Sequence, residues 1–157
     1  MIDGEALALL VAANGTPVLA ALLLGSRGAR PLDGGRRGVD GRPWLGSHKT
    51  WRGLASGLLA AAAAGGALEA GIALGAAFGA LALSGDLASS FAKRRLDLPA
   101  GRESVLLDTL PESLLPLLAL RRPLGLDATS LVATTFAFVV LDVIASRALR
   151  TLRLRPP

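Results

Sequence analysis

Residues 53–86 read GLASGLLAAAAAGGALEAGIALGAAFGALALSGD, and Glu69 is the only charged residue before the terminal Asp86. One straight helix over its apolar part would be roughly 46 Å long, which exceeds the ~30 Å hydrocarbon core of a bilayer. We therefore expect two short membrane spans, 53–66 and 69–84, with the turn at Gly65-Gly66. Small residues recur every four positions on both halves, which lets helix backbones approach closely inside a membrane. The stretch predicts a helical hairpin whose two ends lie on the same side of the membrane.

Other apolar segments extend this hairpin to an all-α, polytopic integral membrane protein with about five transmembrane helices. The additional predicted spans are residues 6–24, 105–120 and 128–146. The span 105–120 is a poor one, because it contains two acidic residues and two prolines, a composition tolerated where a helix lines a polar cavity or packs inside protein. We expect a single membrane-embedded catalytic domain over residues 1–157, with short helical or loop segments at 25–52, 85–104 and 147–157.

The positive charges predict the orientation of this bundle. All but two of the 17 Lys and Arg residues fall in the three connecting and terminal segments, and the exceptions are Arg121 and Arg122. The positive-inside rule then places the N-terminus outside, and the C-terminus and working face in the cytoplasm, in a multi-pass protein of the cell membrane. The net charge of +5 lies between apolar segments, so anionic lipid headgroups and nucleotide phosphates are better partners than nucleic acid. With no cysteine, disulfides and thiolate metal sites are excluded.

Two carboxylates near the basic side are candidates for metal chemistry. Asp86, Ser90, Lys93 and Asp97 share one helix face if the helix continues past the membrane, and Asp108 follows 22 residues after Asp86. Two converging carboxylates suit Mg²⁺ that also bridges substrate phosphates. The alternatives are plain ion pairs: Asp86 with Lys93, and Asp108 with one of the two arginines that follow Lys93.

The first basic segment contains a second candidate site, for phosphate. Its glycines allow a backbone to wrap an anion, and Lys49 and Arg52 are suited to phosphate oxygens. His48, the sole histidine, fits a hydrogen-bonding or phosphate-contacting role, and one histidine cannot form a metal site. The spacing is not that of a Walker A loop, and a solvated basic loop is the alternative. Asn14 precedes Pro17 in the first span, where a kink places a polar group beside freed backbone.

Taken together and in order, these motifs resemble the CDP-archaeol synthase family, which is related to the phosphatidate cytidylyltransferases. The residues that carry the resemblance are Asn14-x-x-Pro17, Pro31-x-Asp33-Gly34-Gly35, Gly46-Ser47-His48-Lys49-Thr50-Trp51-Arg52-Gly53, Gly85-Asp86, Ser90-Phe91-Ala92-Lys93-Arg94-Arg95 and Leu107-Asp108. Archaeal members tend to follow the Leu-Asp pair with Gln and a further Asp, whereas this chain has Thr109, Leu110 and Pro111.

The resemblance implies a nucleotidyltransferase that moves CMP from CTP to a lipid phosphate and releases pyrophosphate, with Mg²⁺ required. It implies that Asp86, Asp108 and Lys93 are catalytic, that the two aspartates also hold the metal, and that further motif residues bind substrate. Those substrate residues are Asn14, Asp33, Gly34, His48, Lys49, Thr50, Arg52, Ser90, Arg94 and Arg95. Expected partners are CTP, an anionic lipid phosphate (archaeol- or diacylglycerol-based) and membrane lipids, and we allow for a homodimer. The competing functions are a CTP-dependent lipid-alcohol kinase and a non-catalytic membrane scaffold whose basic face binds anionic lipid.

Overall fold

The computed structural model describes residues 1–98 and 105–152, and that part of the chain folds into five α-helices. They are α1 (Gly4–Leu24), α2 (Trp51–Ala67), α3 (Ile72–Arg95), α4 (Val105–Ala119) and α5 (Ala128–Thr151). The predicted all-helical class is confirmed, since the described residues form no strand beyond two isolated bridges in the α1–α2 loop. Residues 99–104 and 153–157 of the expected cytoplasmic segments lie outside the described residues.

Three of the helices, α1, α3 and α5, are long and apolar enough to cross a membrane. The other two are short, because α2 has 17 residues and α4 has 15. At 1.5 Å per residue these lengths are about 25 and 22 Å, less than the hydrocarbon core. The prediction of about five membrane helices is therefore confirmed. Three of them are long, and two short ones pack against them.

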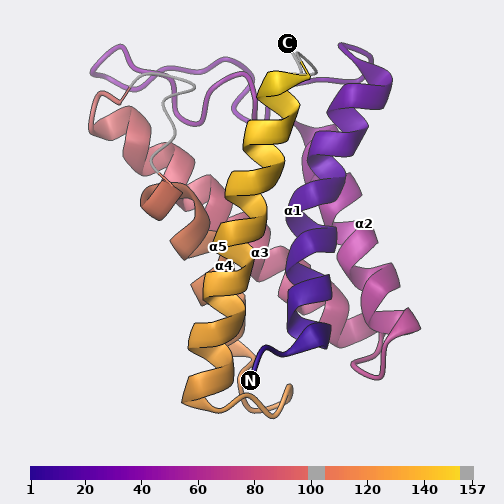
Figure 1. Ribbon diagram of the computed structural model, residues 1–157. Helices are drawn as coiled ribbons and strands as arrows, with labels where there is room; N and C mark the ends of the chain where they lie inside the picture. Colours follow the sequence, from indigo (N-terminus) through magenta and orange to yellow (C-terminus); the bar gives the residue numbers. More distant parts are fainter. Residues whose placement is uncertain (99–104, 153–157) are drawn as a thin grey trace.

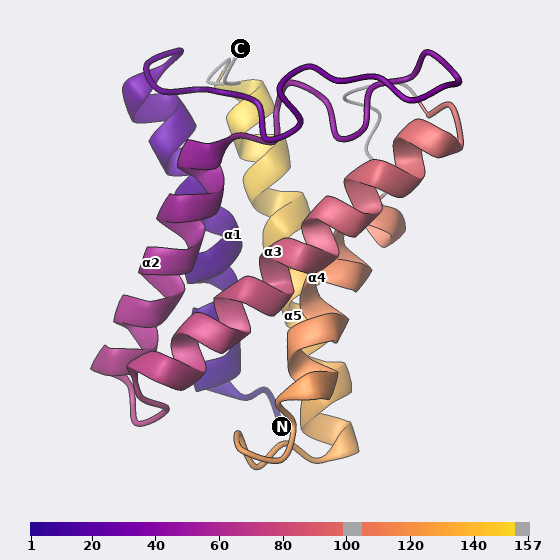
Figure 2. The same cartoon turned by 180° about the vertical axis from the view of Figure 1, so that it is seen from behind.

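The helices form a bundle with two distinct ends (Figure 1). A long loop, residues 25–50, crosses one end, where α5 also ends, and we call this the loop end. The opposite end carries the N-terminus and the α2–α3 and α4–α5 turns. Figure 2 shows α3 crossing the bundle at a steep tilt, so that its last turns reach the far part of the loop. Helix α3 packs most extensively against α2 and α4, and it therefore connects the two halves of the bundle.

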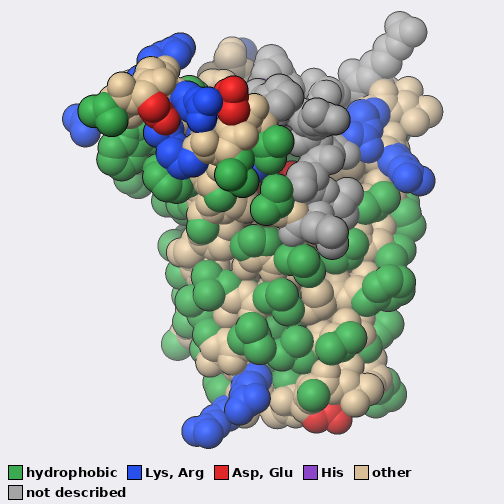
Figure 3. Space-filling model, turned by 90° about the vertical axis from the view of Figure 1, so that its left-hand side faces the viewer, with side chains coloured by type: hydrophobic (Ala, Val, Ile, Leu, Met, Phe, Trp, Pro, Cys, Tyr) green, Lys and Arg blue, Asp and Glu red, His purple; other side chains and the backbone are tan. Residues whose placement is uncertain are grey.

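The apolar core lies between the long helices, and the charges lie at the ends. Phe78 of α3 is fully buried with Leu9 and Leu10 of α1, Leu117 of α4 and Phe138 of α5. On the face shown in Figure 3, Lys and Arg side chains gather at the loop end, above a broad apolar band. A smaller basic group marks the other end, where the α4–α5 turn carries Arg121 and Arg122, both exposed.

The apolar stretch quoted above divides between α2 and α3, but its glycine pair does not form the turn. Gly65 and Gly66 lie in the last turn of α2, and the chain reverses at residues 68–71. A Cβ on Gly65 would lie 2.6 Å from the carbonyl oxygen of Gly71 and 2.7 Å from the Cα of Gly75. The expectation of a turn at Gly65-Gly66 is therefore wrong, because these glycines are needed for contact between the two helices.

Candidate active site at the loop end

An ion pair between Lys49 and Asp86 joins the end of the loop to the middle of α3. The Lys49 Nζ lies 2.6 Å from both carboxylate oxygens of Asp86, and each side chain is about three-quarters buried, at 25% and 24% exposed. Lys49 is held in place because the next residue, Thr50, caps α2 by accepting a hydrogen bond from the Gly53 amide. The pair forms where α2 begins, at the edge of the apolar band.

A second pair, between Lys93 and Asp108, joins the last turns of α3 to the first turn of α4. Lys93 follows Asp86 by two helical turns, so both point from one face of α3, and Ser90 lies buried between them on that face. Neither of the plain pairings considered from the sequence is found, because Asp86 contacts Lys49 instead of Lys93 and Asp108 contacts Lys93 instead of an arginine. Each carboxylate is thus matched by an ammonium that another element supplies.

Asp97 does not join this face, so the prediction that it continues the Asp86–Ser90–Lys93 row is wrong. Helix α3 ends at Arg95, and Asp97 follows it with a left-handed φ of 60°. Its side chain is 77% exposed and pairs with Arg42 of the loop at 3.2 Å.

Glycine at position 85 lets α3 and α4 touch directly beside these pairs. A Cβ on Gly85 would lie 2.2 Å from the carbonyl oxygen of Pro111 and 2.8 Å from the Cα of Glu112. Real Cβ atoms do not approach that closely, so only glycine fits. This contact brings the backbone of Glu112 next to Asp86.

Glu112 is a buried carboxylate, 8% exposed, at the centre of this region. It makes no hydrogen bond or ion pair within residues 1–98 and 105–152. The charged side chains that act on it electrostatically are Asp86, Asp142, Lys49 and Asp108. Lys49, Asp86 and Asp108 therefore lie in one region, and Glu112 lies among them.

The donor set suits a metal ion that arrives with its substrate better than one held by protein alone. No group of three or more His, Cys, Asp or Glu side chains in the described parts of the chain is close enough to bind a metal. Asp86 and Asp108 are hard oxygen donors, each engaged by one lysine. Mg²⁺ usually takes one or two such carboxylates and completes its shell with water and substrate phosphates.

Asp33 fastens the two halves of the loop. Its Oδ2 accepts hydrogen bonds from the Leu45 and Gly46 amides, both at 3.0 Å, and its Oδ1 accepts one from the Gly35 amide at 2.9 Å. Partial burial acts to raise the pKa of Asp33, but these amides together outweigh it and hold the pKa below its usual value. Asp33 thus gives a loop without strands a defined shape.

Arg95 fastens the same loop to the end of α3. Its guanidinium donates to the carbonyls of Arg42 and Pro43, at 3.2 and 2.8 Å, and pairs with Asp40 at 2.6 Å. Arg42 donates in return to the Arg95 carbonyl at 2.7 Å. These contacts hold the loop over the two lysine–aspartate pairs.

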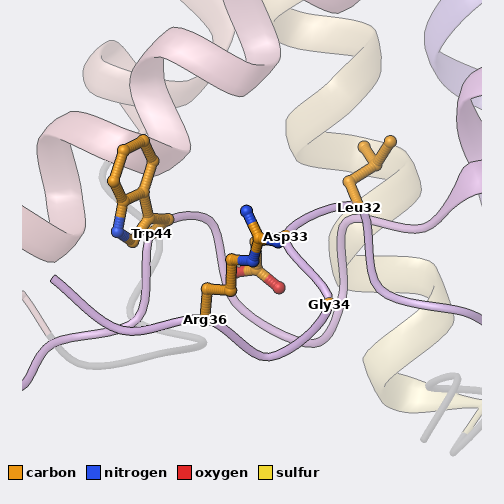
Figure 4. A pocket seen from close by; sticks show the side chains of 5 residues that line it. All are labelled: Leu32, Asp33, Gly34, Arg36 and Trp44. Carbon is orange, nitrogen blue, oxygen red and sulfur yellow. The ribbon is translucent and has the colours of Figure 1, made fainter.

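Three adjoining cavities lie under and within the loop. The first, the loop pocket, has a volume of about 380 Å³ and is lined by Leu32, Asp33, Gly34, Arg36 and Trp44 (Figure 4). The second, the arginine pocket, has about 280 Å³, and Arg37, His48 and Arg94 are its basic lining residues. The third, the pair pocket, has about 60 Å³ and contains Lys49 and Asp86. Leu32 lines the loop and pair pockets, His48 the pair and arginine pockets, and Asp33 the arginine and loop pockets, so each cavity adjoins the other two.

Comparisons with known proteins identify the family of this chain. The CarS-like family model, described as CDP-archaeol synthase, matches residues 6–69 and 61–151. The CDP-archaeol synthase of Hyperthermus butylicus is 40% identical over 154 residues, 93% of this chain and 88% of that protein. That of Aeropyrum pernix is 44% identical over 137 residues, 82% and 74% of the two chains.

The chain belongs to the CDP-archaeol synthase family. A solved structure described as an intramembrane enzyme for archaeal membrane lipids biosynthesis has the same fold, with a TM-score of 0.76 and 35% identity over 90% of each chain. The resemblance seen in the sequence is confirmed. The protein is a multi-pass membrane enzyme, a nucleotidyltransferase that forms a CDP-activated lipid.

Within this family frame, the structure brings several of the predicted site residues together. Lys49 and Asp86 form one pair, and Lys93 and Asp108 form the other, with Ser90 between them. His48 and Arg94 line the arginine pocket, and His48 also lines the pair pocket. Gly34 lines the loop pocket.

Other predicted substrate residues are engaged within the protein. Arg52 donates to the carbonyls of Gly25 and Arg27, and Arg95 to those of the loop. Asn14 donates to the Leu10 carbonyl one turn earlier in α1, at 3.1 Å. Asp33 and Thr50 accept backbone hydrogen bonds, as described above. Direct contact of these five side chains with substrate stays a prediction, and the role visible here is to hold the loop and the start of α2 in place.

The structure adds Glu112, Arg37 and Trp44 to the site. Glu112 follows Asp108 by four residues, so helical spacing placed both on one face, but the intervening Pro111 obscured this. No local pattern indicates Arg37 or Trp44, because their positions depend on the fold of the loop around Asp33.

Proposed function

We propose that the chain transfers CMP from CTP to the phosphate of an archaeol-type lipid, releasing pyrophosphate. Its relatives from Hyperthermus butylicus and Aeropyrum pernix are CDP-archaeol synthases, which supports an archaeol-type lipid. An oxygen of the lipid phosphate attacks the α-phosphorus of CTP, and the bond from that phosphorus to the oxygen bridging the β-phosphate breaks. The electron pair leaves with pyrophosphate. Charge is conserved without an added proton, and no covalent intermediate on the protein is needed.

The two lysine–aspartate pairs beside buried Glu112 are the observation that carries this proposal. Lys49 and Lys93 are both positioned and partly buried, at 25% and 16% exposed, so they are poorly screened by water. A polyphosphate entering the site offers each ammonium a more highly charged partner than a single carboxylate. Such preorganised cations stabilise the negative charge that develops at the reacting phosphates.

Asp86 and Asp108, released from their lysines, would hold Mg²⁺ together with the nucleotide phosphates. When bound there, the ion neutralises phosphate charge and orients the polyphosphate. The protein contributes two hard carboxylates from facing helices, which suits an ion that keeps most of its other positions for water and substrate.

The arginine pocket is suited to the departing pyrophosphate. Arg37, Arg94 and His48 line it, and it adjoins the pair pocket that contains Asp86. Guanidinium groups bind phosphate oxygens in a bidentate manner, so the pocket favours the leaving group over uncharged molecules.

We further propose that the loop end faces the cytoplasm. All Lys and Arg residues of the described chain except Arg121 and Arg122 lie at this end or in the loop, and positive charge is retained on the cytoplasmic side. CTP would then reach the site directly, while the lipid phosphate enters from the inner leaflet. Reporter fusions in the loop and in the α4–α5 turn should read inside and outside, respectively.

A double-label assay tests the reaction. Purified protein with Mg²⁺ and an archaeol-type phosphate, and in a parallel reaction the corresponding lipid alcohol, should transfer label from α-labelled CTP only into the lipid phosphate and release pyrophosphate. Label from γ-labelled CTP should stay out of the lipid. Lipid labelled from the γ-position with release of CDP would identify a lipid kinase instead, and no transfer from either label would leave a non-catalytic scaffold. Asp86→Asn, inserted and purified in the same way, is the matched control and should be inactive.

A further inference from the structure

The loop pocket contains a tryptophan that the proposed chemistry does not use. Trp44 rises from the loop beside α3 (Figure 4). Its ring meets that of Phe91 edge to face, with the centroids 6.3 Å apart. Arg95 in turn lies over the Phe91 ring, 5.2 Å from its centroid. The indole is therefore held from the helix side while Trp44 remains 53% exposed, with an aromatic face available to a planar ligand.

Polar groups in the same pocket match the edge of a pyrimidine. Arg36 lines the cavity, and its guanidinium makes no hydrogen bond or ion pair with any residue that the structure describes. Its N–H groups suit the O2 and N3 atoms of cytosine, which are both acceptors. Uracil carries an N–H at N3, so the same guanidinium disfavours it. Asp33 also lines the pocket, and a carboxylate can accept a hydrogen bond from an exocyclic amine.

The position of the pocket fits the order of groups in a nucleoside triphosphate. The loop pocket and the arginine pocket both adjoin the pair pocket, through Leu32 and His48 respectively. A nucleotide whose α-phosphate lies at Lys49 and Asp86 then has one cavity for its base and another for its β- and γ-phosphates. The loop pocket, at about 380 Å³, lies within the range of small-molecule sites, roughly 300–1,000 Å³.

We propose that the loop pocket binds the cytosine base of CTP, with Trp44 stacking on the ring and Arg36 reading its O2 and N3 edge. This inference rests on the proposed cytidylyl transfer and adds the base-recognition residues to it. It assigns nucleotide choice to the loop, and leaves the chemistry to the carboxylates and lysines of the helices.

Inhibition by two fragments of CTP separates the base site from the phosphate site. CMP retains the base and the α-phosphate, whereas pyrophosphate retains only the leaving group. Trp44→Ala should raise the inhibition constant of CMP by about 5- to 150-fold, the range expected for one base–aromatic stack, and leave that of pyrophosphate unchanged. Arg37→Ala, in the arginine pocket, is the matched variant. It should raise the inhibition constant of pyrophosphate and leave that of CMP unchanged. Arg36→Ala should narrow the preference for CTP over UTP by about 10-fold or more.

Fluorescence gives a readout that does not require turnover. The chain has two tryptophans and no tyrosine, so Trp51→Phe leaves Trp44 as the sole strong emitter. With no lipid phosphate present, CTP and CMP should quench this emission, whereas pyrophosphate should not.

Three results would overturn the inference. Equal weakening of CMP and pyrophosphate by Trp44→Ala would mean that Trp44 only supports the loop. An altered KM for the lipid phosphate with unchanged nucleotide constants would make Trp44 a membrane anchor. Quenching by pyrophosphate alone would place the phosphates, and not the base, beside Trp44. Each of these can occur in a protein that still transfers CMP, so the inference can fail while the proposed function stands, and absence of transfer by the wild-type chain would remove both.

Discussion

Gly85→Ala tests whether close contact between α3 and α4 is required for activity. The new methyl carbon would lie 2.2 Å from the Pro111 carbonyl oxygen, whereas ordinary carbon–oxygen contacts are about 3.3 Å or longer. The shortfall is roughly 1 Å, and the opposing atoms belong to backbone, which cannot rotate away. The two helices must therefore separate at this point, and Glu112 moves away from Asp86.

Two magnitudes follow from this separation. Overpacking of a well-packed site costs roughly 1–3 kcal/mol, which corresponds to a fall in Tm of about 2–12 °C for a chain of this size. Displacement of catalytic groups by about 1 Å reduces rates on the order of 100-fold. We expect activity to fall far more steeply than stability, because Asp86 is the neighbour of the substituted residue while the core around Phe78 lies further along α3.

The assay combines label transfer from α-labelled CTP with thermal unfolding of the purified protein in detergent. Gly15→Ala is the control, since a Cβ there meets only the Val11 side chain, at 4.0 Å, in the interior of α1. That variant should keep full activity, and its Tm should rise slightly because alanine favours helix by about 1 kcal/mol over glycine. If Gly85→Ala keeps wild-type rate and Tm, the α3–α4 contact does not position the site and the reasoning fails.

Three further predictions concern the charges. Asp86→Asn should reduce transfer by at least ~10²-fold and Lys49→Ala by about 10- to 150-fold, with a less than additive loss in the double variant, because the two act as a unit; near-normal kinetics in either single variant would contradict this. Glu112→Gln should raise Tm while lowering turnover, since it removes a carboxyl group that is buried beside Asp86, Asp108 and Asp142; a lowered Tm would show that the carboxyl group stabilises the fold. The folded-state pKa of Asp33 is lowered, so its stabilisation is present above the unfolded value of ~3.9 and is lost as pH falls through the lower folded value. Asp33→Asn should therefore reduce Tm at neutral pH and flatten the fall in Tm below about pH 4, and parallel curves for the two proteins would refute that role.

The helical class and most of the site motifs could be predicted from the sequence because they depend on local pattern. Apolar length and basic connecting segments define membrane helices, and Asp86 with Lys93 shares a face through helical spacing alone. The turn was misplaced because a glycine pair has two physical uses. In the sequence, Gly65-Gly66 fits a chain reversal and a close contact between two helices equally well. Only the packing of Gly75 against Gly65 shows that the contact is correct.

The pairing of charges could not be predicted, because it depends on distant segments. Asp86 had Lys93 available seven residues away, but Lys49 reaches it from 37 residues before. The tilt of α3 and the capped start of α2 decide which lysine pairs with Asp86, and neither feature can be recognised from the local sequence. The same holds for Arg95, whose motif suggests phosphate binding, while its guanidinium contacts the loop carbonyls.

The fastening of the loop to the end of α3 also determines the order in which the protein can be completed during synthesis. The loop, residues 25–50, leaves the ribosome before any of α3 exists, yet its anchor Arg95 lies 53 residues after Arg42 and Asp86 lies 37 residues after Lys49. Until those residues emerge, Arg42 and Lys49 lack the partners that they contact in the folded protein. Only when the third helix has been inserted can the loop close over the site, and Asp108 arrives later still. A nascent chain arrested before α3 would therefore be threaded into the membrane but unable to hold a nucleotide.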